Sequence, residues 1–450
     1  MTFTATQRAI IRETMEAQGI PGLAAAIVKG DEILAAEAFG YRDLEDKLPM
    51  TTGTVMPIAS LSKSFTATAI MQLVEEGKLR LDDPIARYLP DFRFADETAS
   101  RSITPRMLLC HKSGIGRTGH QTRVLEEPER VHYRGRADLV SRLAEVQLQT
   151  PPNEAWSYSN EGYAVLGLLV DTLSGSSLEE HLERRVFGPL GMTSTCSGFP
   201  KWRAMPDRAV GHLRQGARHA RSRLPQDYTA YGAGGGVCTT VIDYARYLAA
   251  SMDHDGTAIL AGGFLDQMQT VSMPYGDTGW GYGFGWQVSW SGPRKVVHHG
   301  GGLPGHSTYA MILPWERLGV AVLTNASPAK PRELAERLLS DALDAPLFRP
   351  NVDDPLPIRT KYPAPDAETL VEYAGAYEHE NVRLMVDTTP PDLTLTIPSP
   401  DGVTESASAV AVGRDLFMGW QQGDLLRFLR GDDGRVVALL TGGVCYSRVL

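Results

Sequence analysis

The chain has 450 residues, of which 42% are hydrophobic and 22% are charged, and its formal net charge is −9. This length exceeds that of a typical single domain, so we expect two domains, or one large domain with an appendage. The negative charge argues against nucleic acid as a main partner, and no basic run is long enough to indicate a membrane surface.

The N-terminal segment, residues 1–19, lacks the basic and apolar regions of a signal peptide. It predicts an amphipathic helix through Ile10, Ile11 and Met15. No stretch approaches the length of a transmembrane helix. The four cysteines are scattered without a CxxC pair, which favours free thiols in a reducing compartment, with two disulfides as the alternative. We therefore expect a cytoplasmic protein.

Helix and strand patterns then follow in a definite order. Further helices are predicted within residues 56–77, where the chain becomes helical after Pro57, at 104–111, 137–146, 161–174 and 178–186, after residue 240, and at 331–345. Strands are predicted at residues 23–28, 33–39, 285–290, 295–298, 307–313 and 319–324. The polar stretches 115–135 and 197–233 predict irregular loops. This order predicts an α/β sandwich, with a sheet flanked by the two terminal helices, plus an all-helical subdomain.

The C-terminal part differs in character. Six prolines between residues 346 and 365 indicate a linker. Beyond it, short strand patterns recur at regular spacing, which predicts a small all-β barrel or sandwich. We therefore divide the chain into residues 1–345, a linker at 346–365, and an all-β domain at 366–450.

The first candidate for chemistry is Ser60 with Lys63, at the start of the central helix. Positions three apart share a helix face, so the amine can lie beside the hydroxyl. A serine hydroxyl needs an adjacent base to become a nucleophile, and a buried lysine can serve as one. Ser-x-x-Lys also occurs by chance, as at Ser327 and Lys330, so further candidate residues are needed to support a catalytic role for Ser60 and Lys63.

The second candidate is Tyr158-Ser159-Asn160, in a loop just before a helix, where side chains often point into a cleft. A neighbouring ammonium favours the phenolate form of a tyrosine, so Tyr158 could take the Ser60 proton and later protonate a leaving group. Asn160 offers an amide donor and acceptor for an amide or ester substrate. The alternative is an aromatic packing residue beside a helix cap.

The third candidate is the run from His298 to Ser307, predicted to connect two strands. Its glycines let a substrate backbone approach closely. The Gly302 amide could join the Ser60 amide as an oxyanion hole. Although the glycines fit GxGxxG, no helix follows, so a dinucleotide site is rejected. For His298, as for His111 and His306, the alternative is a structural histidine with satisfied hydrogen bonds.

Together, these three stretches resemble the motifs of the penicillin-recognising serine hydrolases, in particular the class C β-lactamase-like family. The matching triplets are Ser60-x-x-Lys63, Tyr158-x-Asn160 and His299-x-Gly301. Further matches lie at residues 58–60, 108–114, 187–192, 233–236 and 282–286, and the resemblance covers roughly residues 6–345. It implies the β-lactamase/transpeptidase fold, with an antiparallel sheet.

The resemblance implies an acyl-enzyme mechanism. Ser60 would attack the carbonyl, Lys63 and Tyr158 would handle the proton, and Asn160 would position the substrate. Backbone amides of Ser60 and Gly302 would hold the oxyanion. No metal or cofactor is expected.

One departure concerns the third motif, where β-lactamases of this family usually carry Lys-Thr-Gly. Here His299 replaces that lysine and Gly301 ends the triplet, as in the D-aminopeptidase and esterase-like members. An ordinary histidine is mostly neutral near pH 7, which weakens penicillin as the natural substrate. Some of those members also carry a lipocalin-like C-terminal barrel, which residues 366–450 resemble.

We therefore expect a serine hydrolase of small amides or esters, either a D-amino-acid-type peptidase or a carboxylesterase. The alternatives are a β-lactamase or DD-carboxypeptidase and, in another class, a catalytically silent assembly or sensor protein. The expected partner is a small-molecule, short-peptide or ester substrate, with no nucleic acid and no membrane, and a homo-oligomer stays open. The preferred acyl group and leaving group do not follow from the sequence.

Overall fold

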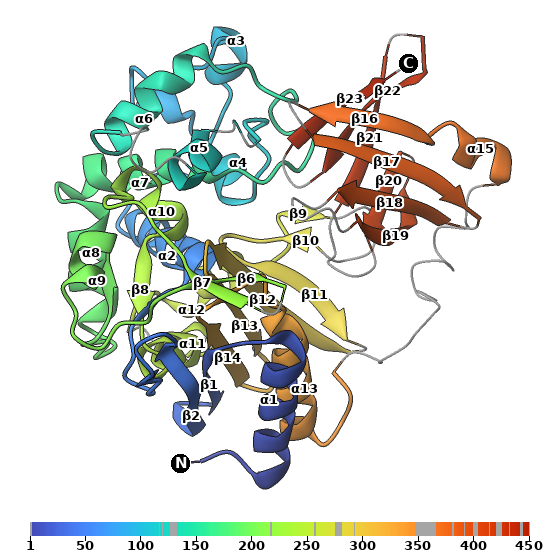
Figure 1. The fold of residues 1–450 in the computed structure, drawn as a ribbon. Helices are drawn as coiled ribbons and strands as arrows, with labels where there is room; N and C mark the ends of the chain where they lie inside the picture. Colours follow the sequence, from blue (N-terminus) through green and yellow to red (C-terminus); the bar gives the residue numbers. More distant parts are fainter. Residues whose placement is uncertain are drawn as a thin grey trace.

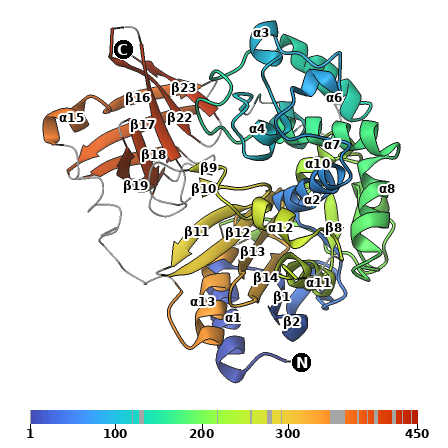
Figure 2. The same ribbon diagram turned by 180° about the vertical axis from the view of Figure 1, so that it is seen from behind.

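The structure is a computed structural model. It describes residues 2–116, 118, 120–126, 133–216, 218–255, 258–274, 281–291, 293–347, 366–379, 382–390, 392–398, 404–413, 415–419, 425–431, 433–441 and 444–449. Within these residues, a sheet and its helices form one unit and a β-barrel forms a second one, beside the β9–β10 end of the sheet (Figures 1 and 2).

The α-helices of the described residues are α1 (Ala5–Gln18), α2 (Ser62–Glu75), α3 (Glu97–Ser100), α4 (Pro105–Leu109), α5 (His120–Glu126), α6 (Arg136–Arg142), α7 (Asn160–Ser174), α8 (Leu178–Leu182), α9 (Phe199–Arg203), α10 (Gly232–Gly235), α11 (Val241–Ser251), α12 (Gly262–Met268), α13 (Pro331–Leu343) and α15 (Ala367–Val371). Short 3₁₀ turns include η1 (Ala59–Leu61), η2 (Ile85–Arg87), η3 (Leu143–Glu145) and η5 (Thr229–Tyr231), and η4 (Glu183–Phe187) is a π-helix.

The strands of the first unit are β1 (Gly22–Lys29), β2 (Glu32–Asp43), β3 (Leu48–Pro49), β4 (Met56–Pro57), β5 (Cys196–Ser197), β6 (His212–Gln215), β7 (Arg218–Arg221), β8 (Val237–Thr239), β9 (Met273–Pro274), β10 (Gly281–Tyr282), β11 (Gln287–Ser291), β12 (Arg294–Leu303), β13 (His306–Leu313), β14 (Leu318–Thr324) and β15 (Ala326–Ser327). The barrel strands are β16 (Gly375–His379), β17 (Val382–Thr389), β18 (Asp392–Pro398), β19 (Thr404–Gly413), β20 (Leu416–Gly419), β21 (Leu425–Arg430), β22 (Val436–Thr441) and β23 (Val444–Val449).

In the described residues, a nine-stranded sheet runs in the order β3-β2-β1-β14-β13-β12-β11-β10-β9, and neighbouring strands are antiparallel. Its central strands are buried on both faces, so they lack the alternation of polar and apolar residues that a half-exposed strand shows. In β1, Ala24 and Ala26 pack on one face, while Leu23 and Ile27 pack on the other. The sheet therefore separates two hydrophobic cores.

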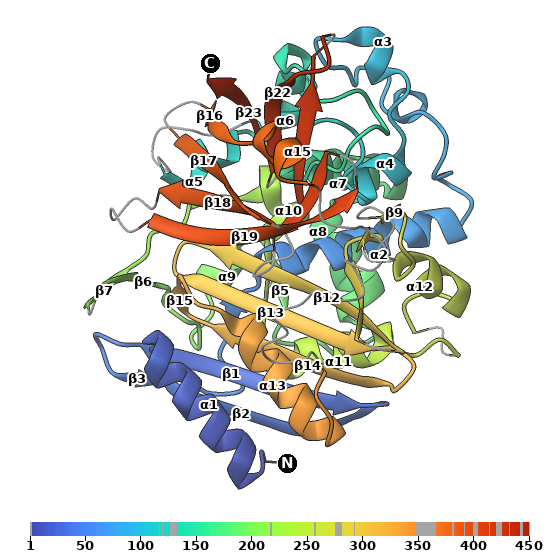
Figure 3. The same ribbon diagram turned by 90° about the vertical axis from the view of Figure 1, so that its right-hand side faces the viewer.

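Helices cover both faces of this sheet. The terminal helices α1 and α13 lie side by side on one face (Figure 3). Helix α1 begins with a capping box between Thr4 and Gln7 and ends at Gly19, whose φ is 61°. On the opposite face, α11 packs against β1 and β14, and the helical part of the unit follows beyond it. This confirms the predicted sandwich of an antiparallel sheet and helices.

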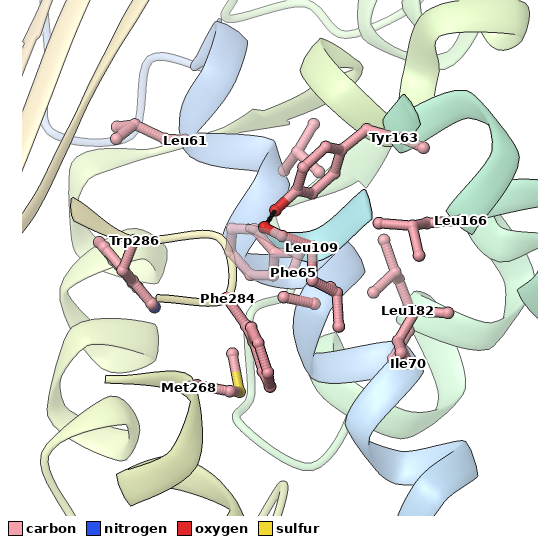
Figure 4. Close-up of a cluster of buried hydrophobic side chains, with 14 of the residues drawn as sticks. Leu61, Phe65, Ile70, Leu109, Tyr163, Leu166, Leu182, Met268, Phe284 and Trp286 are labelled. Carbon is pink, nitrogen blue, oxygen red and sulfur yellow. Dashed lines mark hydrogen bonds between the residues drawn. The ribbon is translucent and has the colours of Figure 1, made fainter. Parts of the chain in front are cut away.

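The predicted central helix, α2, lies inside the helical part. The sequence predicts an apolar stripe, but every residue from Ser62 to Leu73 is buried. Its hydroxyl groups fit there because each is hydrogen-bonded; Thr66 Oγ1, for example, donates to the Ala233 oxygen at 2.7 Å. Phe65 and Ile70 of α2 pack in the same hydrophobic core as Tyr163 of α7 (Figure 4). The start of α2 is therefore firmly held.

The C-terminal unit is a closed antiparallel barrel, because β16 pairs with β17 on one side and with β23 on the other. This confirms the predicted all-β barrel, whereas its likeness to lipocalins stays a prediction. The predicted linker at 346–365 lies outside the described residues apart from 346 and 347, so the domain boundaries also stay predictions. Among the described helices, none is long and apolar enough to cross a membrane.

Two local predictions are wrong. The stretches 115–135 and 197–233, expected to be irregular, contain α5, α9, β6 and β7 among their described residues. The glycine-rich run after His298 is not a connection, because β12 continues to Leu303 and only Pro304 and Gly305 form the turn to β13. Gly305 has a φ of 80°, and proline followed by such a glycine fits a type II turn.

Candidate active site

Ser60 lies in the 3₁₀ turn that precedes α2, so the helix proper begins two residues later than the nucleophile candidate. Ala59, the residue before it, has a φ of 51°, a backbone conformation that residues other than glycine rarely adopt. The turn is held from β8, since the Ile58 amide donates to the Val237 oxygen at 3.0 Å. The backbone of Ala59, directly before Ser60, is therefore fixed in a strained conformation, as is often found next to functional residues.

Lys63 is fully buried, and its Nζ lies within hydrogen-bond distance of three oxygens that carry no formal charge. The distances are 3.2 Å to Ser60 Oγ, 2.6 Å to Asn160 Oδ1 and 2.9 Å to the Gly234 oxygen. This nitrogen also lies 4.7 Å from the centroid of the Tyr158 ring. The structure thus brings Ser60 and Lys63 together with Tyr158 and Asn160, which follow about 100 residues later in the sequence.

Tyr158 is held in place by His111, for which the sequence offered a structural histidine as the alternative. The His111 oxygen accepts from the Ser157 amide at 2.8 Å, and its Nδ1 accepts from the Ser159 amide at 3.1 Å. Its ring also lies against the Tyr158 ring, with centroids 4.3 Å apart. The φ of His111 is 59°, so this clamp depends on an unusual backbone conformation. His111 therefore fixes Tyr158 from both sides.

Asn160 begins α7 and connects two groups of the site. Its Oδ1 accepts from Lys63, and its Nδ2 donates to Gln121 Oε1. Gln121 in turn donates from Nε2 to the Tyr228 hydroxyl. The Asn160 amide is thereby locked in one orientation, because the lysine requires an oxygen and the glutamine oxygen requires an N–H.

His299 is almost fully buried in β12, and both of its ring nitrogens are engaged. Nδ1 lies 2.6 Å from the Gly300 oxygen, which can only accept, so Nδ1 carries the proton and Nε2 accepts from the Tyr282 hydroxyl at 2.8 Å. Burial and the nearby Lys63 lower the pKa of His299 to about 3. The side chain is therefore neutral near pH 7 and places no cation in the site.

The glycines after His299 give β12 a bare edge near Ser60. Strand β11 pairs with β12 only as far as His298, while β13 pairs with it through Leu303. The two-residue turn makes Leu303 and His306 a hydrogen-bonded pair, and the alternation of an antiparallel ladder then turns the Gly302 amide away from β13. Gly302 can therefore donate to a group outside the sheet.

Gly301 is required for this close approach. A Cβ there would lie 2.3 Å from the Ile58 oxygen and 2.3 Å from Thr308 Oγ1. By contrast, a Cβ at Gly302 would meet nothing within 4 Å among the described residues. Strand β12 thus touches the Ser60 turn at Gly301 and leaves space at Gly302.

The other two histidines of this region differ from each other. His298 is a satisfied structural residue, as expected, since it contacts the Ser289 hydroxyl at 3.1 Å and the Tyr309 hydroxyl at 2.7 Å. His306 is fully buried, but neither of its ring nitrogens has a hydrogen-bond partner among the described residues. The prediction of a histidine with satisfied hydrogen bonds is therefore wrong for His306.

Sequence reasoning missed three contributors to the site: the clamp at His111, the Gln121 amide and the Gly234 oxygen. Gln121 falls in a stretch that predicted a loop, and no spacing rule links it to Asn160. Gly234 contributes through its backbone, which carries no residue-type pattern. In the part of the chain that the structure describes, no group of three His, Cys, Asp or Glu side chains is placed to hold a metal ion.

The arrangement can support proton transfer and nucleophilic attack. A hydroxyl lies within hydrogen-bond distance of a buried amine, with a tyrosine ring over that amine and an oriented amide beside it. The amide of Gly302 and the amide of Ser60, in the 3₁₀ turn before α2, are the available donors for a developing oxyanion.

A family model and a known relative both match most of the chain. The family model described as Beta-lactamase matches residues 8–344. Penicillin-binding protein 4 of Amycolatopsis lactamdurans is 32% identical over 329 residues, which are 69% of this chain and 82% of that protein.

Two solved structures are also similar. The octameric penicillin-binding protein homologue of Pyrococcus abyssi is 26% identical with a TM-score of 0.69, covering 98% of this chain and 99% of its own. A D-stereospecific amidohydrolase from Streptomyces sp. is 26% identical with a TM-score of 0.62, covering 74% of this chain and 97% of its own. The Pyrococcus structure thus matches the barrel of this chain as well as its sheet and helices.

Proposed function

The chain belongs to the Beta-lactamase family, and on this premise we propose that it is a serine hydrolase that cleaves small amides or esters through an acyl-enzyme at Ser60. One observation carries the proposal: the buried Lys63 amine lies 3.2 Å from the Ser60 hydroxyl. A serine becomes nucleophilic when such a base accepts its proton.

In the proposed mechanism, the Ser60 oxygen attacks the substrate carbonyl while its proton passes to the Lys63–Tyr158 pair. The same pair then protonates the leaving group, and water releases the acyl group from the serine. Asn160 orients the lysine and the substrate amide. Backbone N–H groups of Ser60 and Gly302 stabilise the oxyanion.

The state of His299 supports a preference among substrates. A β-lactam carboxylate, or the C-terminal carboxylate of a peptide, is favoured by a fixed positive charge beside it. His299 is neutral, and both of its nitrogens already have partners. We therefore propose substrates without a free carboxylate next to the scissile bond, namely D-amino-acid amides or carboxylic esters; the Streptomyces relative is named a D-stereospecific amidohydrolase, which favours the amides.

A second candidate, a β-lactamase or DD-carboxypeptidase, is favoured by the 32% identity to a penicillin-binding protein. A third, a silent assembly protein, would need Ser60 to be unreactive. The octameric relative also favours a homo-oligomer, which light scattering of the purified protein would test.

The test compares kcat/KM for D-alanine p-nitroanilide, p-nitrophenyl butyrate and nitrocefin. A matched pair, a short D-amino-acid peptide with a free carboxylate and its C-terminal amide, tests the charge directly. We expect the amide to be cleaved about tenfold faster or more, since no charged contact supports the carboxylate. Faster turnover of the free carboxylate, or of nitrocefin, would select the second candidate, and no turnover of any substrate would select the third.

A further inference from the structure

Two cysteines face each other in the small sheet that supports the Ser60 turn. This sheet has the order β4-β8-β5 in the described residues. Cys196 in β5 and Cys238 in β8 are direct register partners. Residues that are opposite in an antiparallel pair project from the same face, so their side chains are neighbours.

The spacing of the two backbones suits a covalent bridge. The Gly198 amide donates to the Gly236 oxygen at 2.9 Å, so those two residues form a hydrogen-bonded pair. Cys196 and Cys238 lie two positions further along both strands and belong to the same class of pair. Their Cα atoms are then roughly 5.5 Å apart, inside the range that a disulfide spans without backbone movement.

The two thiols also interact and differ in acidity. Cys196 is 4% exposed and Cys238 is fully buried. A hydrogen bond from Cys238 lowers the pKa of the Cys196 thiol, whereas burial raises the pKa of Cys238. Cys196 is thus the better nucleophile of the pair.

We propose that Cys196 and Cys238 are an oxidation site, at which a small peroxide forms a cross-strand disulfide that locks β5 to β8. Neither the acyl-transfer chemistry nor any candidate site residue uses these thiols, so the proposal is independent of the proposed function.

The chemistry balances with one equivalent of peroxide. The Cys196 sulfur attacks one peroxide oxygen, an S–O bond forms, and the O–O bond breaks; the released hydroxide takes the Cys196 proton and becomes water. Cys238 then attacks the sulfenic sulfur. An S–S bond forms, the S–O bond breaks, and the leaving hydroxide takes the Cys238 proton. Two thiols are oxidised and both peroxide oxygens are reduced to water.

The disulfide between Cys196 and Cys238 would lie next to the turn that carries Ser60. Within β8, Val237 accepts from the Ile58 amide and donates to Ser62 Oγ, both at 3.0 Å. Cys238 is the next residue, so the bridge would tie the strand that supports the Ser60 turn to β5. Because the strands are already in register, we expect the bridge to stabilise the fold.

The experiment treats the full chain with hydrogen peroxide and then removes the oxidant. After unfolding, iodoacetamide counts the free thiols by intact mass. The reduced protein has four cysteines and takes four labels, and we expect the oxidised protein to take two and to regain four after dithiothreitol. Peptide mapping should find Cys196 joined to Cys238, and the Tm should rise on oxidation.

Matched variants keep the outcome unambiguous. Cys110→Ser should still form the bridge, as should Cys445→Ser. Cys196→Ser should lose both the bridge and the rise in Tm. Four labels after oxidation, a bridge between another pair, or a fall in Tm with the bridge formed would each overturn the proposal.

Discussion

Lys63 donates from Nζ to Asn160 Oδ1 at 2.6 Å, a shorter contact than the 3.2 Å that separates the same nitrogen from Ser60 Oγ. The amide thus fixes the lysine, and Gln121 fixes the amide from its other side. The geometry of the candidate base depends on a residue that does not touch the serine. This dependence makes the network testable by substitution.

Replacing Asn160 with alanine should lower kcat by about 10²-fold, because the amine loses the partner that aims it at Ser60. Asn160→Asp is the matched variant, since it keeps an oxygen at the same position but adds a charge that favours the ammonium. Steady-state kinetics should show a shifted acid limb in the kcat pH profile of Asn160→Asp. A pH profile and kcat equal to wild type in both variants would contradict the network.

His111 should act through Tyr158. Asparagine tolerates a positive φ and offers an oxygen near the place of Nδ1, so His111→Asn should stay within about fivefold of wild-type kcat. Phenylalanine keeps a ring but cannot accept from the Ser159 amide, so His111→Phe should lose about 10²-fold through misplacement of the tyrosine. The kcat and KM of both variants are measured together. Equal losses would show that only the fold depends on this position.

Gly301 and Gly302 form a matched pair for stability. Gly301→Ala should destabilise by about 1–3 kcal/mol, because the added Cβ would lie 2.3 Å from the Ile58 oxygen. Gly302→Ala adds its methyl group to empty space and keeps the amide, so its free energy of unfolding should match wild type. Denaturant titration measures both. A loss at Gly302 as large as at Gly301 would contradict the placement of β12.

Burial should make the fold sensitive to acid. The pKa values of His299 and His306 are lowered to about 3, below the ordinary value of about 6.5. Between these values the unfolded chain binds protons that the folded chain excludes. Stability is therefore present above about pH 6.5 and is lost as pH falls toward 3, at most about 1.4 kcal/mol per pH unit for each histidine.

The His306→Phe variant tests this origin of the acid sensitivity. Phenylalanine keeps a buried ring but does not titrate, and the His306 ring nitrogens have no hydrogen-bond partner in the described residues. The variant should lose less stability than wild type between pH 7 and pH 5, as measured by urea titration. An unchanged slope would mean that other groups cause the effect.

The three motifs were predictable from sequence because each lies where a pattern marks it. Lys63 lies in the first turn of α2 with Ser60 in the 3₁₀ turn before it, Asn160 follows a helix cap, and the glycines mark a close backbone approach. That these stretches meet follows from the sheet and helix packing, which no local spacing contains. Family resemblance, rather than periodicity, supplied their association.

Other features could not be predicted for physical reasons. The glycine run looked like a loop because it has no side chains with strand preference, yet pairing with β13 keeps it extended to Leu303. The role of His111 depends on its positive φ, and residue type does not reveal that conformation. Helix α2 is buried all round because its hydroxyls find partners in other elements, which only the fold provides.

The most direct test of the central claim is intact-protein mass spectrometry after incubation with a fluorophosphonate. Wild type should gain one adduct, and Ser60→Ala should gain none, whereas the buried neighbour variant Ser64→Ala should still be labelled. Peptide mapping would place the adduct on Ser60. A wild-type protein that stays unlabelled, or an adduct that persists in Ser60→Ala, would contradict the account.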